Sequence, residues 1–302
     1  MRKTRGMDNA VRDEIVRFVL ASPENRHRDG REHYFDEPLV GFASAADPLF
    51  DEYKRIIGPF HRTPAQWMAA EPDAQVLLQG TVICWILPVA LATRETNRRE
   101  RVWPSREWAH TRNHGENFNV LLRLHVVAFL LGRGHRAMAA QLSPDWKRID
   151  DTSAGIASSW SERHAAYAAG LGTFSLNDGL ITERGIAHRC GSVITDLVLP
   201  PTKRSATDPR GNCLYHRDGS CGICIDRCPA GALSREGHDK SKCREYCHVE
   251  IPRAVGERFQ VTEIGCGLCQ TLVPCEGRIP RIGERVPPAR WRAEADALPT
   301  GG

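Results

Sequence analysis

The chain lacks the features that mark an exported or membrane-embedded protein. After the basic start Met1–Arg5, residues 6–12 are polar and acidic where a signal peptide needs an apolar stretch. The longest apolar run, 81–92, contains Pro88 and is far shorter than the roughly 20 residues that span a bilayer. We therefore expect a soluble, cytoplasmic protein without membrane contact.

The sequence also has no strong excess of one charge, no internal repeat and no low-complexity segment. Its net charge of +4 is too modest to require a nucleic acid as partner. A hydrophobic fraction of 41% and a charged fraction of 26% are typical of a globular protein. Because 302 residues exceed the usual size of one domain, we expect two unequal domains.

Apolar patterning predicts a mixture of helices and strands. Helical spacing predicts helices over 11–20, 116–132 and 160–170. The continuously apolar, β-branched stretches 81–90 and 191–199 predict buried strands, the first of them central in a sheet.

A polar, turn-rich segment at 202–212 predicts the domain boundary. We expect an α/β domain over 1–200, a metal-binding domain over 201–284 and a peripheral tail over 285–302.

Cysteine is scarce except in one region. Nine of the 11 cysteines lie between Cys213 and Cys275, and only Cys84 and Cys190 lie outside. Such clustering in a chain without an export signal predicts a local metal site and not a set of disulfides. The run Cys221-x2-Cys224-x3-Cys228-Pro is typical of ferredoxins, in which the cysteine before proline serves a second cluster.

A second set of cysteines follows this motif. Crossed ligation, as in two-cluster ferredoxins, predicts one [4Fe–4S] cluster on Cys213, Cys221, Cys224 and Cys275. It predicts the other on Cys228, Cys243, Cys266 and Cys269. Cys247 is left over, so either Cys213 or Cys247 is a spectator. The alternative is a zinc site on Cys221, Cys224, Cys266 and Cys269, which leaves five nearby cysteines unexplained.

Two segments together carry a family resemblance. With the motif at 221–229 and the run Trp160-Ser-Glu162-Arg163-His164-Ala-Ala-Tyr167-Ala-Ala-Gly170-Leu-Gly172, the chain resembles the epoxyqueuosine reductase-like family. It is more distantly similar to the reductive dehalogenases. The likeness covers about 81–275.

The resemblance implies an α+β protein. A nitroreductase-like α/β domain would bind base-off cobalamin, and a bacterial two-[4Fe–4S] ferredoxin-like domain would feed electrons to the cobalt. It implies an oxidoreductase supplied by an external donor of the flavodoxin or ferredoxin type and acting on a small or medium organic substrate. The alternatives are an electron-transfer iron–sulfur protein without a corrinoid, or a reductase that carries a flavin.

The resemblance also implies site residues. The expected catalytic residues are Glu162, Arg163, Tyr167 and Asp151. The expected cofactor-binding residues are His110, His114, Gly170, Gly172, Cys190, Gly191 and Ser192. Each has a plainer alternative: a solvated helix face for the Glu-Arg pair, a surface loop for the histidines, a helix C-cap for Gly170 and a small buried side chain for Cys190.

The sequence departs from the family in three places. Ile156 stands where the family has an aspartate that protonates the substrate, so Asp150, Asp151 or Tyr167 would have to replace it. The gap between Cys269 and Cys275 is longer than in the family pattern. The chain ends soon after the ferredoxin-like region, without the helical repeats of the longer tRNA-modifying members, so a tRNA substrate is not expected.

Overall fold

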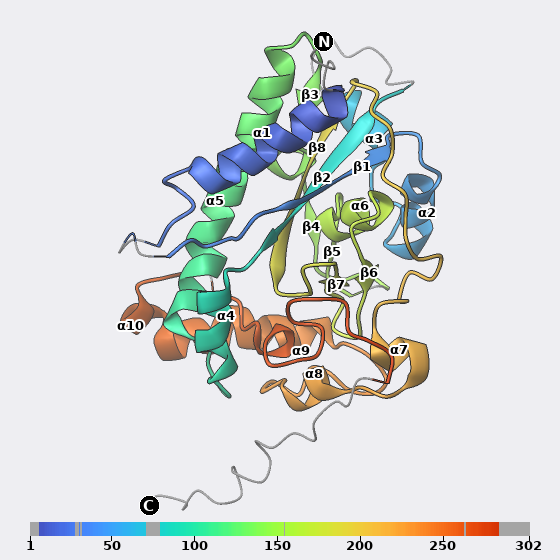
Figure 1. The fold of residues 1–302 in the computed structure, drawn as a ribbon. Helices are drawn as coiled ribbons and strands as arrows, with labels where there is room; N and C mark the ends of the chain where they lie inside the picture. The colour runs from blue at the N-terminus through green and yellow to red at the C-terminus, as the bar shows by residue number, and fades with distance from the viewer. Residues whose placement is uncertain are drawn as a thin grey trace, which may run out of the picture.

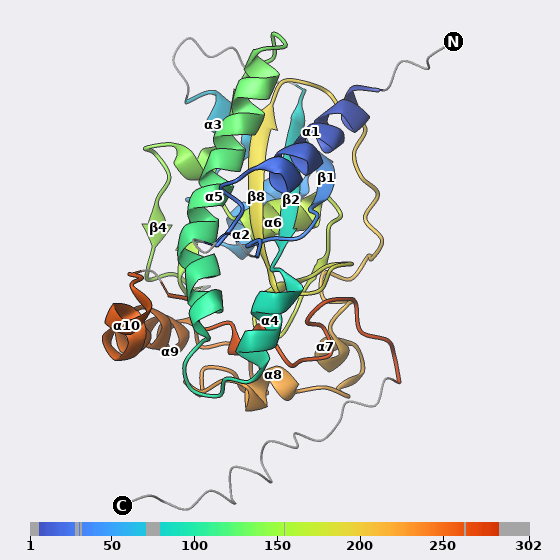
Figure 2. The same ribbon diagram turned by 60° about the vertical axis from the view of Figure 1, so that its left-hand side comes forward.

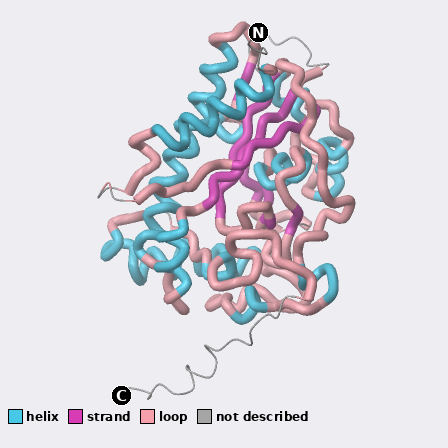
Figure 3. The backbone as a smooth tube through the Cα atoms, viewed as in Figure 1, coloured by secondary structure: helices cyan, strands magenta, loops and turns pink. Residues whose placement is uncertain are grey.

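The fold is built around one four-stranded sheet. The computed structural model of the chain describes residues 6–283 apart from 28–29, 31, 71–78, 154 and 263. The strands lie in the order β1-β2-β8-β3, and every neighbouring pair is antiparallel (Figure 1, Figure 3). Their bounds are β1 Leu39–Ser44, β2 Thr81–Pro88, β8 His188–Thr195 and β3 Ala137–Met138. The expected mixture of helices and sheet is confirmed.

The strand predicted at 81–90 is β2, and it is central and buried along its whole length. Because successive side chains of a strand point to opposite faces, Val82, Cys84 and Ile86 join one apolar core. Ile83 and Trp85 join the other. A strand with a core on each face reads as an uninterrupted apolar run, which is why it could be predicted.

Helices cover both faces of the sheet (Figure 1, Figure 2). On one face α5 (Arg106–Leu131) packs against β8, and α1 (Met7–Ala21) packs on α5. On the other face α6 (Glu162–Ala168) contacts β1, β2 and β8, and α2 (Leu49–Ile56) packs on α6. The helix predicted over 11–20 is α1.

The long helix α5 begins earlier than the sequence predicted. Ser105 caps it, since its hydroxyl accepts a hydrogen bond from the backbone N–H of Trp108 at 3.1 Å, so the helix starts at Arg106 and not at residue 116. His110 and His114 therefore lie on a helix. The expectation of a surface loop there was wrong, and His110 is only 8% exposed.

The other predicted elements exist with shifted ends. The helix expected over 160–170 is α6, and the strand expected over 191–199 is β8. At Thr195, the last residue of this strand, the side-chain hydroxyl donates to the Arg136 carbonyl at 2.8 Å. The Asp196 carboxylate then accepts from the Arg136 backbone N–H at 3.0 Å, which leads the chain out of the sheet.

The cysteine-rich segment forms short helices beyond one end of the sheet (Figure 1). They are α7 Leu214–Asp218, α8 Ile223–Asp226, α9 Lys240–Glu245, two π-helical turns Tyr246–Glu250 and Pro252–Gly256, α10 Glu257–Phe259 and a 3-10 turn Leu268–Gln270. The remaining elements are α3 Pro64–Met68, α4 Leu91–Arg98, a 3-10 turn Ala140–Leu142, β4 Arg148–Ile149, β5 Ala157–Ser158, β6 Thr173–Phe174 and β7 Leu180–Ile181.

Two expectations stay outside what the structure tests. The predicted tail 285–302 lies outside the described residues, and the boundary near residue 200 stays a prediction. Over the ranges described above, no helix is long and apolar enough to cross a membrane.

Candidate functional site

A cavity of about 560 Å³ lies where the sheet meets the cysteine-rich segment. The open end of β8 contributes His188, Arg189 and Cys190 to its wall. These three residues are half-buried, whereas the five that follow them in β8 are buried. The cavity therefore lies at the first residues of β8, and His188, Arg189 and Cys190 all border it.

The cavity wall is rich in cationic side chains. Several of them come from segments far apart in the sequence: Arg112, Arg148, Arg163, Arg189, Lys240 and Arg244. Asp150 neutralises part of this charge, because it pairs with Arg148 at 2.8 Å and with Arg244 at 3.5 Å. The lining is thus polar and carries hydrogen-bond donors for a polar or anionic group.

A buried ion cluster supports the cavity from behind. Arg123 is 2% exposed, and its guanidinium lies 3.0 Å from the carboxylate of Glu116 and 3.2 Å from that of Glu162. Glu116 and Arg123 are seven residues apart on α5, so they share one face of the helix. This cluster joins α5 to the first turn of α6.

The two carboxylates of the cluster have opposite pKa shifts. Burial alone would raise the pKa of Glu116, but Arg189 and Arg123 outweigh it and lower that pKa to about 2. Burial raises the pKa of Glu162, and the attraction of Arg123 opposes it only in part. Glu116 is therefore a fixed anion, while Glu162 is the carboxylate more easily protonated.

Glu162 is also hydrogen-bonded to the sheet. The Ser192 hydroxyl donates to its carboxylate, and the Trp160 indole N–H donates to Ser192 at 3.0 Å. Because Trp160 is buried, this chain of bonds fixes the start of α6 against β8. Glu162 therefore has a structural role in addition to its place in the cavity wall.

The first cysteine group contains Cys213, Cys221, Cys224 and Cys275. Burial, followed by the thiols of Cys221 and Cys213, raises the pKa of Cys224 to about 12. Burial also raises the pKa of Cys275, with further contributions from the other three thiols. These are the four cysteines that crossed ligation assigned to one cluster.

The second cysteine group contains Cys228, Cys243, Cys247, Cys266 and Cys269. Burial raises the pKa of Cys266, and the thiols of Cys247, Cys269 and Cys228 raise it further. Cys243 donates a hydrogen bond to Cys247, which raises the pKa of Cys243 and lowers that of Cys247. The ninth cysteine, which the sequence left unplaced, lies in this group.

The two groups differ in their relation to the cavity. Cys243, Cys247, Cys266 and Cys269 line it, whereas the cysteines of the first group are not among its lining residues. The groups adjoin each other, since Cys224 is the thiol that most strongly raises the pKa of Cys269 after burial. They thus form a series that leads from the first group through the second to the cavity.

The zinc site considered from the sequence does not match this grouping. It would draw Cys221 and Cys224 from the first group and Cys266 and Cys269 from the second. In the part of the chain that the structure describes, no three His, Cys, Asp or Glu side chains are placed to hold a single metal ion.

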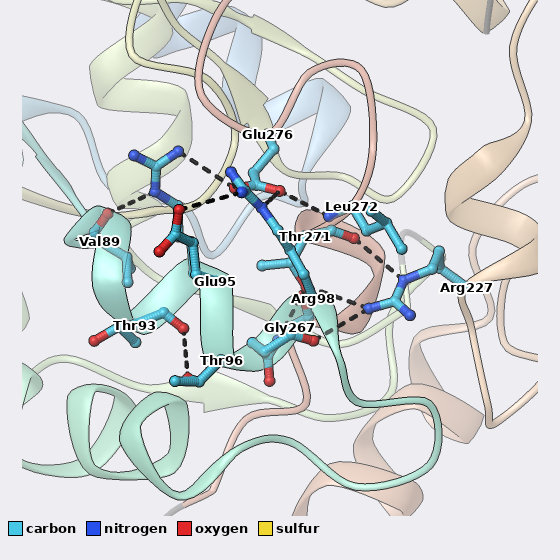
Figure 4. Close-up of polar contacts among 12 residues, drawn as sticks. Val89, Thr93, Glu95, Thr96, Arg98, Arg227, Gly267, Thr271, Leu272 and Glu276 are labelled. Carbon is cyan, nitrogen blue, oxygen red and sulfur yellow. Dashed lines mark hydrogen bonds and ion pairs between the residues drawn. The ribbon is translucent and has the colours of Figure 1, made fainter. Parts of the chain in front are cut away.

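Arg227 ties the cysteine loops to the sheet domain (Figure 4). It is 5% exposed, and its guanidinium donates to the carbonyls of Leu268 and Thr271 at 3.2 Å and to that of Glu100 at 2.8 Å. Because Arg227 directly precedes Cys228, these hydrogen bonds orient the ferredoxin-type motif. The planar guanidinium group of Arg has five N–H donors, so one side chain can bond carbonyls of several segments at once.

Several predicted site residues lie away from the cavity. Tyr167 belongs to the core beneath the sheet, and Asp151 is exposed and not among the lining residues. His110 bonds the Phe259 carbonyl at 2.8 Å, and His114 lies one turn further along α5. Of the expected catalytic residues, Glu162 and Arg163 line the cavity, and so does Ile156.

The predicted glycines have close packing partners. Gly170 has φ +74°, and a Cβ there would lie 3.0 Å from the Lys203 carbonyl oxygen. A Cβ on Gly172 would lie 2.5 Å from the Ile181 carbonyl oxygen, and one on Gly191 would lie 2.4 Å from the Trp85 ring. Gly170 and Gly172 line a separate cavity of about 390 Å³.

The cavity is also lined by four residues that were not predicted from the sequence: Glu116, Arg123, Arg189 and His188. The first two carried a signal, since a Glu-Arg pair seven apart interrupts an otherwise apolar predicted helix. Arg189 and His188 carried no such signal, because polar residues at the start of a strand are common and do not by themselves indicate a functional site.

Comparison with known proteins supports the family resemblance. No family model matches the chain. Over 145 residues it is 34% identical to the epoxyqueuosine reductase of Gloeobacter violaceus, a match that covers 46% of this chain and 41% of the relative. Over 253 residues it is 25% identical to the epoxyqueuosine reductase of Bacillus anthracis, covering 78% of this chain and 60% of the relative.

A shorter match reaches the dehalogenases. Over 104 residues the chain is 40% identical to the tetrachloroethene reductive dehalogenase of Dehalobacter restrictus, covering 34% of this chain and 18% of that protein. A solved epoxyqueuosine reductase with an epoxyqueuosine-modified tRNA stem loop is 18% identical, with a TM-score of 0.47 over 90% of this chain and 67% of that one.

The curated matches confirm the resemblance to the epoxyqueuosine reductase-like family. The chain spans between 41% and 60% of the length of the two epoxyqueuosine reductases described above.

Proposed function

We propose that this chain is an iron–sulfur reductase in which two [4Fe–4S] clusters pass electrons to a corrinoid in the cavity of about 560 Å³. The observation that carries the proposal is that four cysteines of the second group line the same cavity as Glu162, Arg163 and Cys190. A cluster that has Cys243, Cys266 and Cys269 among its ligands would border the space in which a reaction can occur.

The cysteine groups fit the clusters chemically. Thiols must be deprotonated to bind iron, and burial makes that ionisation costly for Cys224, Cys266 and Cys275. Bound iron supplies the compensating positive charge. Backbone N–H groups donate to the sulfurs of Cys221, Cys224 and Cys266, as they do around iron–sulfur clusters whose potential they tune.

The proposed ligands follow from the grouping. The first cluster would be held by Cys213, Cys221, Cys224 and Cys275, and the second by Cys228, Cys243, Cys266 and Cys269. Once Cys243 is a ligand and has lost its proton, Cys247 would donate its S–H to the Cys243 sulfur. A nitroreductase-like domain over 1–200 and a ferredoxin-like domain over 201–284 belong to the same proposal.

The cavity fits an organic cofactor. Its volume lies in the range of about 300–1,000 Å³ found for pockets of drug-sized ligands, so it would enclose the reacting part of a corrinoid and not the whole of that larger cofactor. Its donors can bond the amide groups of a corrinoid. A bound corrinoid would supply the reducing chemistry, and the protein would orient the reactants and exclude water. Glu162, held by Arg123 and Ser192, would keep the wall rigid.

An epoxyqueuosine-modified tRNA is one substrate to be considered for this reductase. The relatives are named for epoxyqueuosine, and one solved structure holds a tRNA stem loop, so the expectation against tRNA finds no support. Electrons would enter from an external flavodoxin- or ferredoxin-type donor through the first cluster, which does not border the cavity.

A second candidate is a flavin in place of the corrinoid. The cationic lining, with Arg148, Arg163 and Lys240, favours it because a flavin nucleotide carries phosphate. A yellow chromophore that survives removal of the iron would identify it.

The test is elemental analysis of protein purified without oxygen, incubated with hydroxocobalamin and desalted. We expect about eight iron atoms and one cobalt per chain. Cys228→Ala should lose about half of the iron, whereas Cys84→Ala, a buried cysteine outside both groups, should keep all of it. Iron without cobalt would remove the corrinoid from the proposal, and zinc alone would overturn it.

A further inference from the structure

His188 and Cys190 form a side-chain pair in the cavity. They are two residues apart on β8, so their side chains point to the same face of the strand. Both line the cavity. The Cys190 sulfur lies 3.6 Å from Nδ1 of His188, which is within hydrogen-bond range for sulfur.

The surroundings of His188 assign the protons of the pair. Its Nε2 lies 2.8 Å from the Leu180 carbonyl oxygen, and a carbonyl only accepts, so Nε2 carries a hydrogen. Burial lowers the pKa of His188 to about 4, so the ring is neutral and Nδ1 is an acceptor. The thiol of Cys190 therefore donates to Nδ1.

The sulfur itself is protonated at neutral pH. Burial raises the pKa of Cys190 to about 12, against the opposing attraction of Arg163 and Arg189. Cys190 is thus a thiol and not a thiolate before reaction. Once the sulfur had lost its proton, the two guanidinium groups would stabilise it, whereas the carboxylates of Glu162 and Glu116 would oppose them and favour its reprotonation.

Other acidic groups in the cavity wall have different partners. Glu162 is held by Arg123 and Ser192. The proton-donating aspartate that the family resemblance implies is replaced by Ile156, which also lines the cavity. The remaining thiols of the lining belong to the second cysteine group.

We propose that Cys190 is the proton donor for the substrate reduced in this cavity, with His188 as the positioning residue that orients the S–H bond. The inference rests on the proposed reductase function. The substrate carbon receives an electron pair that comes from the external donor through the clusters. With tetrachloroethene a C–Cl bond breaks, chloride leaves, and the S–H bond breaks as a C–H bond forms. With an epoxide both C–O bonds break to give an alkene, and the S–H proton goes to the departing oxygen, which leaves as hydroxide. In both cases the thiolate left behind takes a proton from water.

The first experiment measures access to the thiol without requiring turnover. Cluster-loaded protein is treated with iodoacetamide under anaerobic conditions between pH 8 and pH 10, and modified cysteines are located by mass spectrometry. We expect Cys190 to react and buried Cys84 not to react. His188→Gln should speed alkylation roughly fivefold and move its pH profile downward, because a hydrogen bond that the thiol donates to Nδ1 stabilises the protonated sulfur.

The second experiment measures turnover with titanium(III) citrate as reductant. The probes are an epoxyqueuosine-modified tRNA stem loop and tetrachloroethene. Cys190→Ala should lower kcat at least about 100-fold, and Cys190→Ser should restore part of it, with iron content unchanged. Cys84→Ala is the matched control and should keep kcat.

The outcomes separate the two proposals. If the wild-type protein reduces neither probe, the reductase function loses support, and the alkylation result alone judges Cys190. A Cys190 that iodoacetamide does not reach, or a Cys190→Ala variant with kcat within about threefold of wild type, overturns the inference.

Discussion

Arg98 Nη2 lies 2.7 Å from a carboxylate oxygen of Glu276, so α4 is bound directly to the residue that follows Cys275. The same carboxylate accepts the backbone N–H of Leu272 at 2.7 Å, and Arg94 approaches it at 3.4 Å (Figure 4). One buried side chain therefore holds the last cysteine loop against the sheet domain. The position of Cys275 depends on this contact as well as on the chain itself.

Replacing Glu276 should loosen this loop. Glu276→Ala removes the carboxylate that Arg98 and the Leu272 N–H contact at 2.7 Å, so we expect a loss of about 2–4 kcal/mol in the free energy of unfolding. Urea denaturation of cluster-loaded protein measures it. Glu95→Ala is the matched control, because Glu95 pairs with the same Arg98 at 3.8 Å but is 51% exposed, and it should cost less than about 1 kcal/mol.

The cysteine grouping predicts which replacements cost iron. Cys213→Ser should lose about half of the iron despite the unusual spacing of Cys213, because it lies among the first group. Cys247→Ser should keep it, since four other cysteines remain in the second group. Iron analysis after anaerobic reconstitution measures both. Loss of iron in Cys247→Ser with full iron in Cys243→Ser would reverse the assignment of these two residues.

The ion cluster predicts a pH-dependent stability. The folded pKa of Glu116 is about 2 against 4.5 in the unfolded chain, so its contribution is present above about pH 4.5 and is lost as the pH falls toward 2. Glu116→Gln should be less stable than wild type at pH 7. The difference between the two proteins should shrink below about pH 4.5. Denaturation at several pH values measures this difference, which would stay constant if the carboxylate were unpaired.

The contact between Gly191 and Trp85 predicts a sensitive position. The two residues are partners across β8 and β2, and a Cβ at 191 would lie 2.4 Å from the indole ring. Gly191→Ala should cost about 1–3 kcal/mol, seen as a lower Tm. Gly132→Ala at the end of α5 is the control, because φ is −64° there and the added Cβ would lie 3.3 Å from its nearest neighbour. An equal Tm for both variants would contradict the packing argument.

The sequence alone determined the features that depend on neighbours along the chain. The apolar run of β2 predicted a central strand because both of its faces are covered. The family resemblance followed from the spacing of Cys221, Cys224 and Cys228 together with the segment from Trp160 to Gly172. Those spacings are local and can be read directly.

Only the tertiary structure decided which distant residues share a site. Cys213 and Cys275 come together although 61 residues separate them in the printed sequence, and a cysteine pattern does not encode that contact. The start of α5 depended on the cap at Ser105, which moved His110 from an expected loop into a helix. The pairing of His188 with Cys190 needed the end of β8 to open into a cavity, because hydrogen bonds and burial arise from three-dimensional packing.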